Sequence, residues 1–148
     1  MLRIRSTKEN QRGATLVEFA IGATVFLTAM FGVLECGRAL WTHNALADAA
    51  RRGARYGTLH GIGDLDKVKN VVVFGNPEGT GNPIVSDLSV NNVDVEYSTF
   101  NLNGGTVQVT INNYQFQFVV PIIGTTISMP KYTTTLTAES AGYIPNDM

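Results

Sequence analysis

The sequence predicts an α+β fold in which one long amino-terminal helix packs on a small antiparallel β-sheet. Three observations lead to this prediction. Residues 14–57 contain no proline and join an apolar run to a strongly helix-forming continuation. Residues 93–138 instead alternate apolar and polar side chains over short runs, as half-buried strands do. The apolar face of that sheet needs a cover, and the amphipathic half-helix 38–57 is the obvious one.

Residues 1–13 form a polar, basic leader without apolar periodicity, and we expect it to be disordered. Its four basic residues and one acid give a charge of +3, while the other seven basic and 11 acidic residues give −4. Positive charge beside a first hydrophobic helix stays in the cytoplasm. This asymmetry predicts a cytoplasmic amino terminus and a body outside the membrane. An acidic body also argues against nucleic-acid binding.

The apolar run 14–34 has the length of a membrane-spanning helix. It holds 21 residues, against about 20 needed to cross a bilayer, and Glu18 is the one charged residue among them. On insertion scales, placing an acid within such a span costs on the order of 3 kcal/mol. We therefore expect an acid at this position to have a function. The helix should continue to Gly57 as its C-cap, with Asp48 and Arg52 as an i,i+4 ion pair.

A narrow stripe of mostly small side chains recurs at every fourth residue of the predicted helix. Its members are Gly37, Trp41, Ala45, Ala49 and Gly53. Small residues allow another surface to approach closely. Over 45–53 we expect that surface to be the chain's own sheet, with a neighbouring helix as the alternative. The single cysteine, Cys36, excludes an intrachain disulfide; we expect it to be buried, with an intermolecular bridge as the alternative.

Residues 58–91 are rich in loops. Asp64 can cap a short helix because apolar residues follow it at helical spacing, although the run VVVF at 71–74 is equally compatible with a strand. Four later runs alternate as strands, at 93–97, 107–111, 114–118 and 132–138. Asn112-Asn113 suggests a tight hairpin between the second and third runs, and Pro121 should end the third because proline cannot donate to a central ladder.

No residue pattern in the sequence predicts catalysis, a cofactor or a metal. The loop GNPEGTG at 75–81 shares only glycines with a phosphate-binding loop and lacks the Gly-Lys-Ser/Thr ending. His43 and His60 have no partners at zinc-ligand spacing. Asp64 and Asp66 lack the rest of a calcium loop. We therefore expect a protein that is not an enzyme and needs no cofactor.

Two ordinary interpretations of the amino-terminal segment leave Glu18 unexplained. A cleaved signal peptide is disfavoured, because the apolar run exceeds the usual 7–15 residues and Ala45-Leu46-Ala47 would place the cut in mid-helix. A plain uncleaved anchor fits the length better. Neither accounts for an acid inside the apolar run.

The segment RGATLVEFA at 12–20 resembles a type IV prepilin processing site. The shared pattern is a basic leader, Gly13, four residues and then Glu18-Phe19 at the start of a long apolar helix. This resemblance implies cleavage after Gly13 by a prepilin peptidase, a commonly methylated new terminus at Ala14, and a role for Glu18 in assembly. Ala14 departs from the phenylalanine of the common major pilins, and Glu-Phe is closer to the tight-adherence (Flp) branch.

The resemblance extends to the TadE-like family of minor pilins, or pseudopilins, through FGVLECGRALW, NALADAARRGARYG and, more weakly, residues 107–121. It implies a cleaved leader 1–13, a transmembrane assembly helix 14–37 and a pilin-like periplasmic domain 38–148 of a single-pass inner-membrane protein. The implied partners are the membrane, the prepilin peptidase, other pilins and the pilus assembly platform. The alternative is a membrane-anchored periplasmic binding or adhesion domain whose helix is an uncleaved tether.

Overall fold

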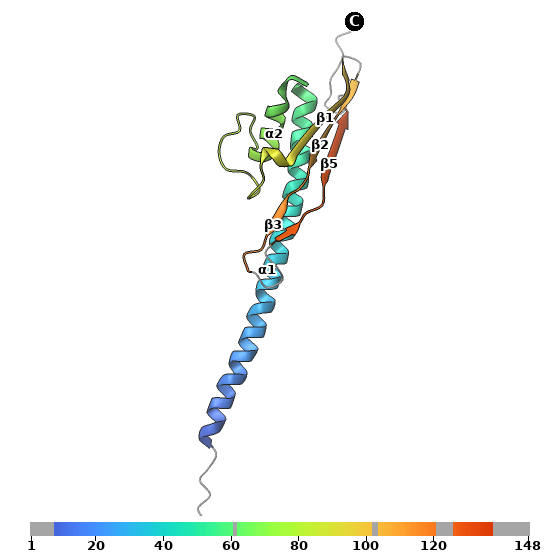
Figure 1. Cartoon of the computed structure of the whole chain (residues 1–148). Coiled ribbons are helices and arrows are strands. Elements are labelled where there is room, and N and C mark those ends of the chain that lie inside the picture. Colours follow the sequence, from blue (N-terminus) through green and yellow to red (C-terminus); the bar gives the residue numbers. More distant parts are fainter. Residues whose placement is uncertain (1–7, 61, 102–103, 121–125, 138–148) are drawn as a thin grey trace, which may run out of the picture.

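The computed structural model describes residues 8–60, 62–101, 104–120 and 126–137, and it is dominated by one helix. Helix α1 (Lys8–His60) is 53 residues long and extends far beyond the body that packs on its carboxy-terminal half (Figure 1). The other elements are the short 3₁₀ helices η1 (Ile62–Asp64) and η2 (Val90–Asn92), helix α2 (Leu65–Phe74), and the strands β1 (Val93–Asn101), β2 (Gly104–Ile111), β3 (Gln115–Gln117), β4 (Thr126–Ser128) and β5 (Tyr132–Thr137).

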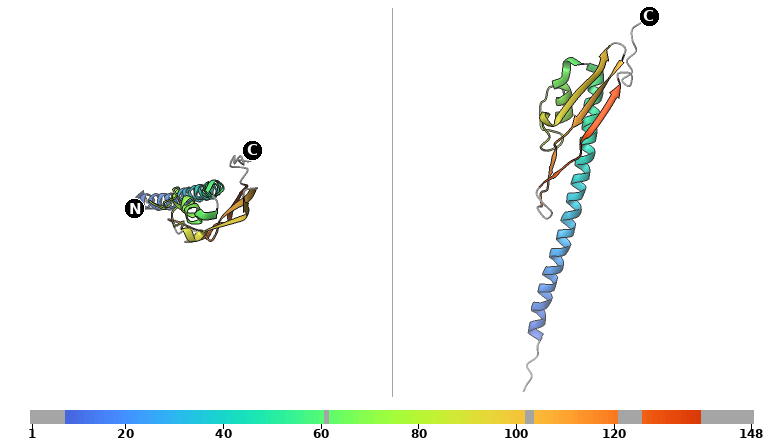
Figure 2. Two further views of the ribbon diagram at one scale, coloured as in Figure 1. Left: turned by 90° about the horizontal axis from the view of Figure 1, so that it is seen from above. Right: turned by 45° about the vertical axis from the view of Figure 1, so that its right-hand side comes forward.

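The main sheet has three antiparallel strands in the order β1-β2-β5. Its register pairs Val93 with Ile111 and Ile111 with Tyr132, so the three strands are aligned at one end. Strands β3 and β4 form a separate two-stranded ladder lower along α1 (Figures 1 and 2). The predicted α+β class, with a long helix on a small antiparallel sheet, is confirmed.

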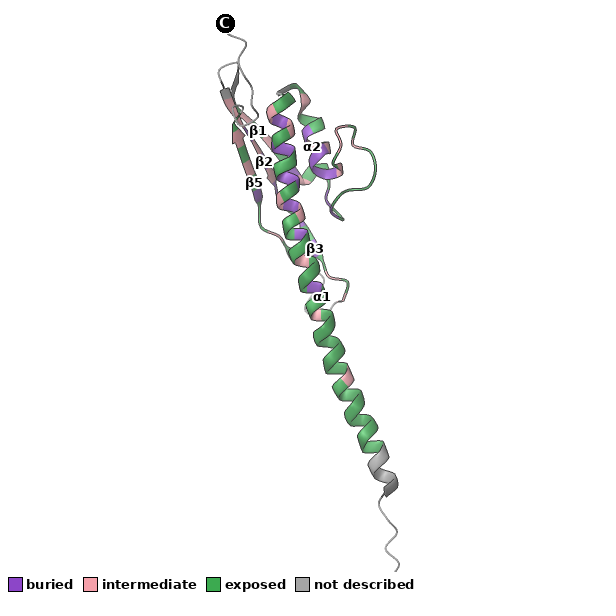
Figure 3. Cartoon of the chain, turned by 180° about the vertical axis from the view of Figure 1, so that it is seen from behind, coloured by how far each residue is buried: buried purple, intermediate pink, exposed green. Residues whose placement is uncertain are grey.

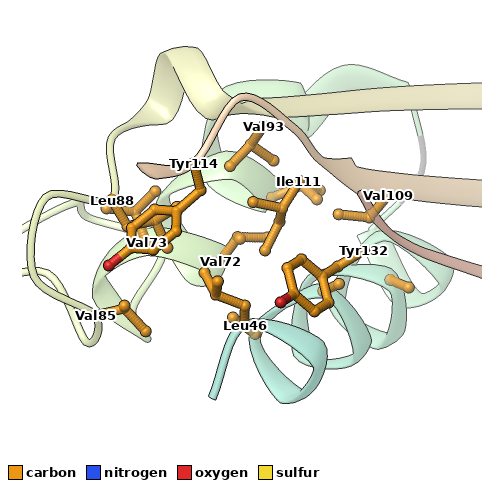
Figure 4. Packing of buried hydrophobic residues seen from close by; sticks show 14 of the residues in the cluster. Leu46, Val72, Val73, Val85, Leu88, Val93, Val109, Ile111, Tyr114 and Tyr132 are labelled. Atoms are coloured by element: carbon orange, nitrogen blue, oxygen red, sulfur yellow. The ribbon is translucent and has the colours of Figure 1, made fainter. Parts of the chain in front are cut away.

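One face of the sheet is covered by both helices, with α1 against β2 and β5 and α2 against α1 and β1. Between these layers lies the core shown in Figure 4, where Leu46 from α1, Val72 from α2 and Ile111 from β2 are fully buried. Helix α1 therefore contributes to the core with its carboxy-terminal half, as its amphipathic sequence predicts.

Between residues 13 and 34, no described part of the chain buries α1. Figure 3 shows its surface as a nearly continuous exposed region, whereas buried residues gather where the sheet and α2 lie against it. The most apolar 18-residue window of the helix has a mean hydropathy of 1.9, and none of it is buried. In length and composition α1 is therefore able to cross a membrane.

The predicted start and end of the long helix, at residues 14 and 57, were both wrong. Residues 8–13 of the expected disordered leader are helical, and α1 continues past Gly57 to His60. A Cβ on Gly57 would lie only 2.9 Å from Cγ1 of Val107 and 3.1 Å from Oη of Tyr97. The glycine therefore serves the close approach of the helix to the sheet and does not terminate the helix.

Two further expectations about α1 were also wrong. Asp48 pairs with Arg51, one residue short of the expected Arg52, at 3.3 Å. Cys36 is exposed, because the side chain that turns toward the body at this level is its neighbour Glu35, about 100° away around the helix.

The ambiguous run 65–74 is a helix, α2, and its valines 68, 71, 72 and 73 are buried. Asp64 stands at the N-cap position, but its side chain makes no capping hydrogen bond and instead forms an ion pair with Lys67 at 2.9 Å. At the other end Gly75 adopts φ 78° and donates its backbone N–H to the carbonyl of Val71, which closes the helix.

The expected hairpin between residues 107–111 and 114–118 does not form. Strand β2 already pairs with β1 on one edge and β5 on the other, so no edge remains for the third run. Asn113, at φ 53°, redirects the chain, and Gln115–Gln117 pairs with Thr126–Ser128 instead. Strand β3 ends before Pro121, which lies outside the described residues.

Candidate functional site

The predicted processing and assembly residues all lie on the exposed amino-terminal half of α1. Gly13, Ala14 and Glu18 are exposed, and the Phe19 side chain is 73% exposed. Their neighbours Leu16 and Val17 are equally uncovered. An exposed apolar surface of this size marks a site of contact with lipid or with other apolar helices.

The small-residue stripe divides into two parts. Ala49 and Gly53 are buried, and a Cβ on Gly53 would overlap the side chain of Val72 in α2. Ala45 is half-buried, whereas Gly37 and Trp41 are exposed. The carboxy-terminal part of the stripe, at Ala49 and Gly53, therefore faces the chain's own body. The amino-terminal part, at Gly37 and Trp41, is open to another molecule.

Glu35 is a buried acid whose role the sequence analysis missed. Its Oε1 atom accepts the backbone N–H groups of Val119 and Val120, at 3.2 and 3.3 Å. Its Oε2 atom lies 2.6 Å from Nη1 of Arg38. This carboxylate thus fastens the chain after β3 to α1, at the first residue beyond the apolar run. The i,i+3 spacing of Glu35 and Arg38 could have predicted the ion pair. It could not have predicted the backbone N–H groups that Glu35 also accepts.

Arg38 links this contact to a cleft beside the helix. Its guanidinium carbon lies 5.1 Å from the centre of the Phe116 ring, close enough for a cation–π interaction. The cleft has a volume of about 290 Å³ and lies between α1, the chain at 85–87 and β3. Its polar lining includes Arg38, Thr42, Ser86, Asp87 and Gln117, with Trp41 on its rim.

The two histidines make contacts within the structure. Nδ1 of His43 lies 2.8 Å from Oη of Tyr132, which ties α1 to β5. The His60 ring stacks on Tyr56 with 3.9 Å between centroids. Within the described ranges, no three His, Cys, Asp or Glu side chains come together in a way that could hold a metal ion.

Three tyrosines in or beside the core predict how the stability of the body responds to alkaline pH. Burial raises the pKa of Tyr97, Tyr114 and Tyr132 above 10.0, with the charge of Asp87 a further cause at Tyr114. The unfolded chain therefore loses these protons at a lower pH than the folded one. The contribution of the three phenols to stability is complete below pH 10 and is lost as pH rises through the raised folded pKa values.

We expect the free energy of unfolding to stay level up to about pH 9 and to fall above pH 10. Chemical unfolding of the detergent-solubilised chain between pH 8 and 11, with phenolate absorbance followed in parallel, measures this. Tyr114→Phe should make the fall shallower, although it also loses the 2.8 Å hydrogen bond that Tyr114 donates to the Ser86 carbonyl. An equally steep fall in that variant would contradict the assignment to this side chain.

The exposed apolar helix and the covered sheet together define an α+β protein with one helix long and apolar enough to cross a membrane. Residues 13–55 match the family model described as TadE-like protein, which confirms the resemblance seen in the sequence. The match begins at Gly13 and ends within the part of α1 that contributes to the core. No curated protein and no solved structure matches the chain. The matched segment comprises 43 of the 148 residues and lies entirely within α1.

Proposed function

We propose that the chain is a minor pilin, or pseudopilin, of a Flp-type pilus assembly system, and that it assembles through the amino-terminal half of α1. The observation that carries this proposal is the arrangement at the start of the TadE-like match. Gly13, Ala14 and Glu18 lie exposed on one continuous helix, and Glu18 is the one charged residue between 14 and 34. Processing there would create a charged terminus within reach of a charged partner.

The proposed division of the chain follows the exposure of α1. A cleaved leader, 1–13, holds the basic cluster and stays in the cytoplasm. Residues 14–37 form the transmembrane and assembly helix. Residues 38–148 form the pilin-like domain on the periplasmic side of the inner membrane. The burial of α1 begins at Glu35, close to the proposed boundary.

Gly13 has no packing role in the part of the chain that the structure describes. A Cβ at this position would meet nothing within 4 Å. Glycine is also poorly suited to a helix interior, where it costs about 1 kcal/mol relative to alanine. Packing therefore does not explain this glycine, and its position directly before Ala14, at the start of the family match, fits a site that another protein recognises. A prepilin peptidase would gain from it a close approach to the backbone, because no Cβ stands in the way.

Gly13→Val is expected to leave the chain at full length while it still inserts into the membrane. The added branched side chain would restrict the backbone and block close approach of the peptidase. The measurement is the intact mass and amino-terminal sequence of membrane-extracted protein. The unsubstituted chain should begin at Ala14.

Gly22→Val is the matched control, because it makes the same change on the same helix where a Cβ also meets nothing within 4 Å. This variant should be cut normally. Equal trimming of both variants would place the cut elsewhere. A natural chain that begins at Met1 would favour the alternative function, a membrane-anchored binding or adhesion domain that presents the cleft beside Arg38 and Trp41.

A further inference from the structure

A group of exposed apolar side chains lies on and beside α1 at the carboxy-terminal end of its apolar run. We name it the collar, and its members are Leu34, Leu40, Trp41, Val119 and Ile127, which are between 50% and 72% exposed. Three come from the helix, and the other two come from the β3–β4 ladder and the chain next to it. Figures 1 and 2 show this ladder lying along α1, on the side of the main sheet that faces the exposed half of the helix.

The height of the collar is fixed by Glu35. This residue follows Leu34, the last residue of the apolar run, and its carboxylate accepts the N–H groups of Val119 and Val120. The chain at 119–120 therefore lies level with the end of the run. Trp41 follows Glu35 by six residues, which is about 9 Å along the helix axis. The headgroup layer on each side of a bilayer is about 5–8 Å thick, so the collar spans this layer if 14–34 spans the hydrocarbon.

The charges near the collar suit the same environment. Glu35 is buried and paired with Arg38, so it brings no uncompensated charge to the membrane boundary. The Arg38 side chain remains 46% exposed and is available to lipid phosphates. Tryptophan is enriched at membrane–water interfaces, where its ring packs on acyl chains and its N–H meets polar groups. Apolar surface, a cation and an indole thus occur together within about 9 Å along the helix axis.

We propose that the collar is a second membrane contact, in which the β3–β4 ladder rests in the headgroup layer of the outer leaflet and Glu35 holds it to the helix. The ladder fixes the depth and tilt of α1 more tightly than a single helix does. The proposal depends on α1 crossing the bilayer and is independent of cleavage after Gly13. If the chain also enters a fibre, the collar must first leave the lipid.

The test uses single cysteines in the full chain with Cys36→Ser, each labelled with the fluorophore NBD and reconstituted into phosphatidylcholine–phosphatidylglycerol vesicles. Val119→Cys and Ile127→Cys report on the collar. Phe26→Cys reports on the span, and Glu78→Cys reports on an exposed loop of the body. Nitroxide lipids with the quencher near the headgroup, and iodide in the water, measure lipid contact and water contact separately.

We expect headgroup-level nitroxides to quench the Val119 and Ile127 labels at least threefold more than the Glu78 label, with iodide quenching reduced to a similar degree. Trp41, the only tryptophan, should show the same depth without a label. Glu35→Ala should raise iodide quenching at Val119 while the Phe26 label keeps its lipid contact. That result would identify Glu35 as the residue that holds the ladder down.

Two outcomes would overturn the proposal. Iodide quenching at Val119 and Ile127 equal to that at Glu78, with Phe26 still quenched by lipid, would show an inserted helix whose collar faces water. Protection of both collar labels from iodide without quenching by lipid would show that protein, such as a second copy, covers the collar. Neither outcome depends on processing, which the mature amino terminus reports separately.

Discussion

Gly53→Leu should destabilise the folded body by about 3 kcal/mol, the upper range for overpacking a well-filled core. Gly53 is buried where α1 meets α2, and even a Cβ there would overlap the side chain of Val72. Val72 is fully buried and β-branched, so it has little room to move. A leucine would therefore separate the two helices and disturb the contact with Val109 in β2. Denaturant unfolding of the full chain in detergent, followed by near-ultraviolet circular dichroism, measures this loss.

Gly37 provides the matched control, because it lies on the same helix and a Cβ there meets nothing within 4 Å. Gly37→Leu should not destabilise the body, because the new side chain overlaps nothing at its Cβ and leucine gains up to about 1 kcal/mol of helix propensity over glycine. The alanine pair sharpens the comparison. Gly37→Ala should stabilise the body by about 1 kcal/mol, because it gains helix propensity without overlap. Gly53→Ala makes the same gain, but overpacking against Val72 opposes it. Equal effects at both positions would mean that α2 does not pack on α1 at Gly53.

Features of the fold that depend on local sequence could be predicted. The apolar run 14–34 and the helix formers after it define one helix by composition alone. Alternation at 93–97 and 107–111 likewise defines two strands whose apolar faces need a cover. Each of these patterns extends over neighbouring residues only, so the predictions made from them were correct without knowledge of the rest of the chain.

Features that depend on competition between distant segments could not be predicted. Residues 115–117 alternate as a strand does, and they do form β3. Because β5 occupies the second edge of β2, β3 pairs with β4 and not with β2. Gly57 looks like a helix end in sequence and is a contact point in the structure, because Val107 approaches it from 50 residues away. Asp64 likewise stands where a cap is expected, yet Lys67 takes its carboxylate.

The candidate site shows the same division. Gly13, Ala14 and Glu18 were proposed from a local pattern, and they remain a prediction; the family match begins at Gly13. Glu35 was passed over because its partners, the N–H groups of Val119 and Val120, are more than 80 residues away. An acid at the end of an apolar helix looks like an ordinary boundary residue until the chain that it holds is known.

Glu18→Val should produce a chain that inserts and is cut but does not join or start a fibre. The expectation rests on the proposed cleavage after Gly13, which leaves a charged amine at Ala14. Glu18 lies four residues further on, about 6 Å along the axis and on the same face of the helix. In a bundle of such helices, the amine of one subunit can pair with Glu18 of a neighbour displaced along the axis. The pair fixes the register, because a single buried charge without a partner costs several kcal/mol.

The valine variant removes this partner and makes the apolar run more uniform, so insertion should improve slightly. Cleavage should continue, because Glu18 is a full helical turn from the bond that is cut. The fraction of mature chain by mass spectrometry and the yield of crosslinked oligomers in the membrane separate the two steps. We expect an unchanged mature fraction and at least a tenfold loss of crosslinked oligomer.

Two substitutions at the same position determine whether charge or size is responsible. Glu18→Asp keeps the charge on a shorter stem and should assemble at an intermediate level, whereas Glu18→Gln keeps the size without the charge and should fail as the valine variant does. Because Glu18 contacts no other part of the described body, none of the three changes should alter the melting of the sheet. Normal oligomers from Glu18→Gln would remove the ion pair from the assembly mechanism. Normal oligomers from Glu18→Val as well would reduce Glu18 to an interfacial acid and favour the uncleaved tether.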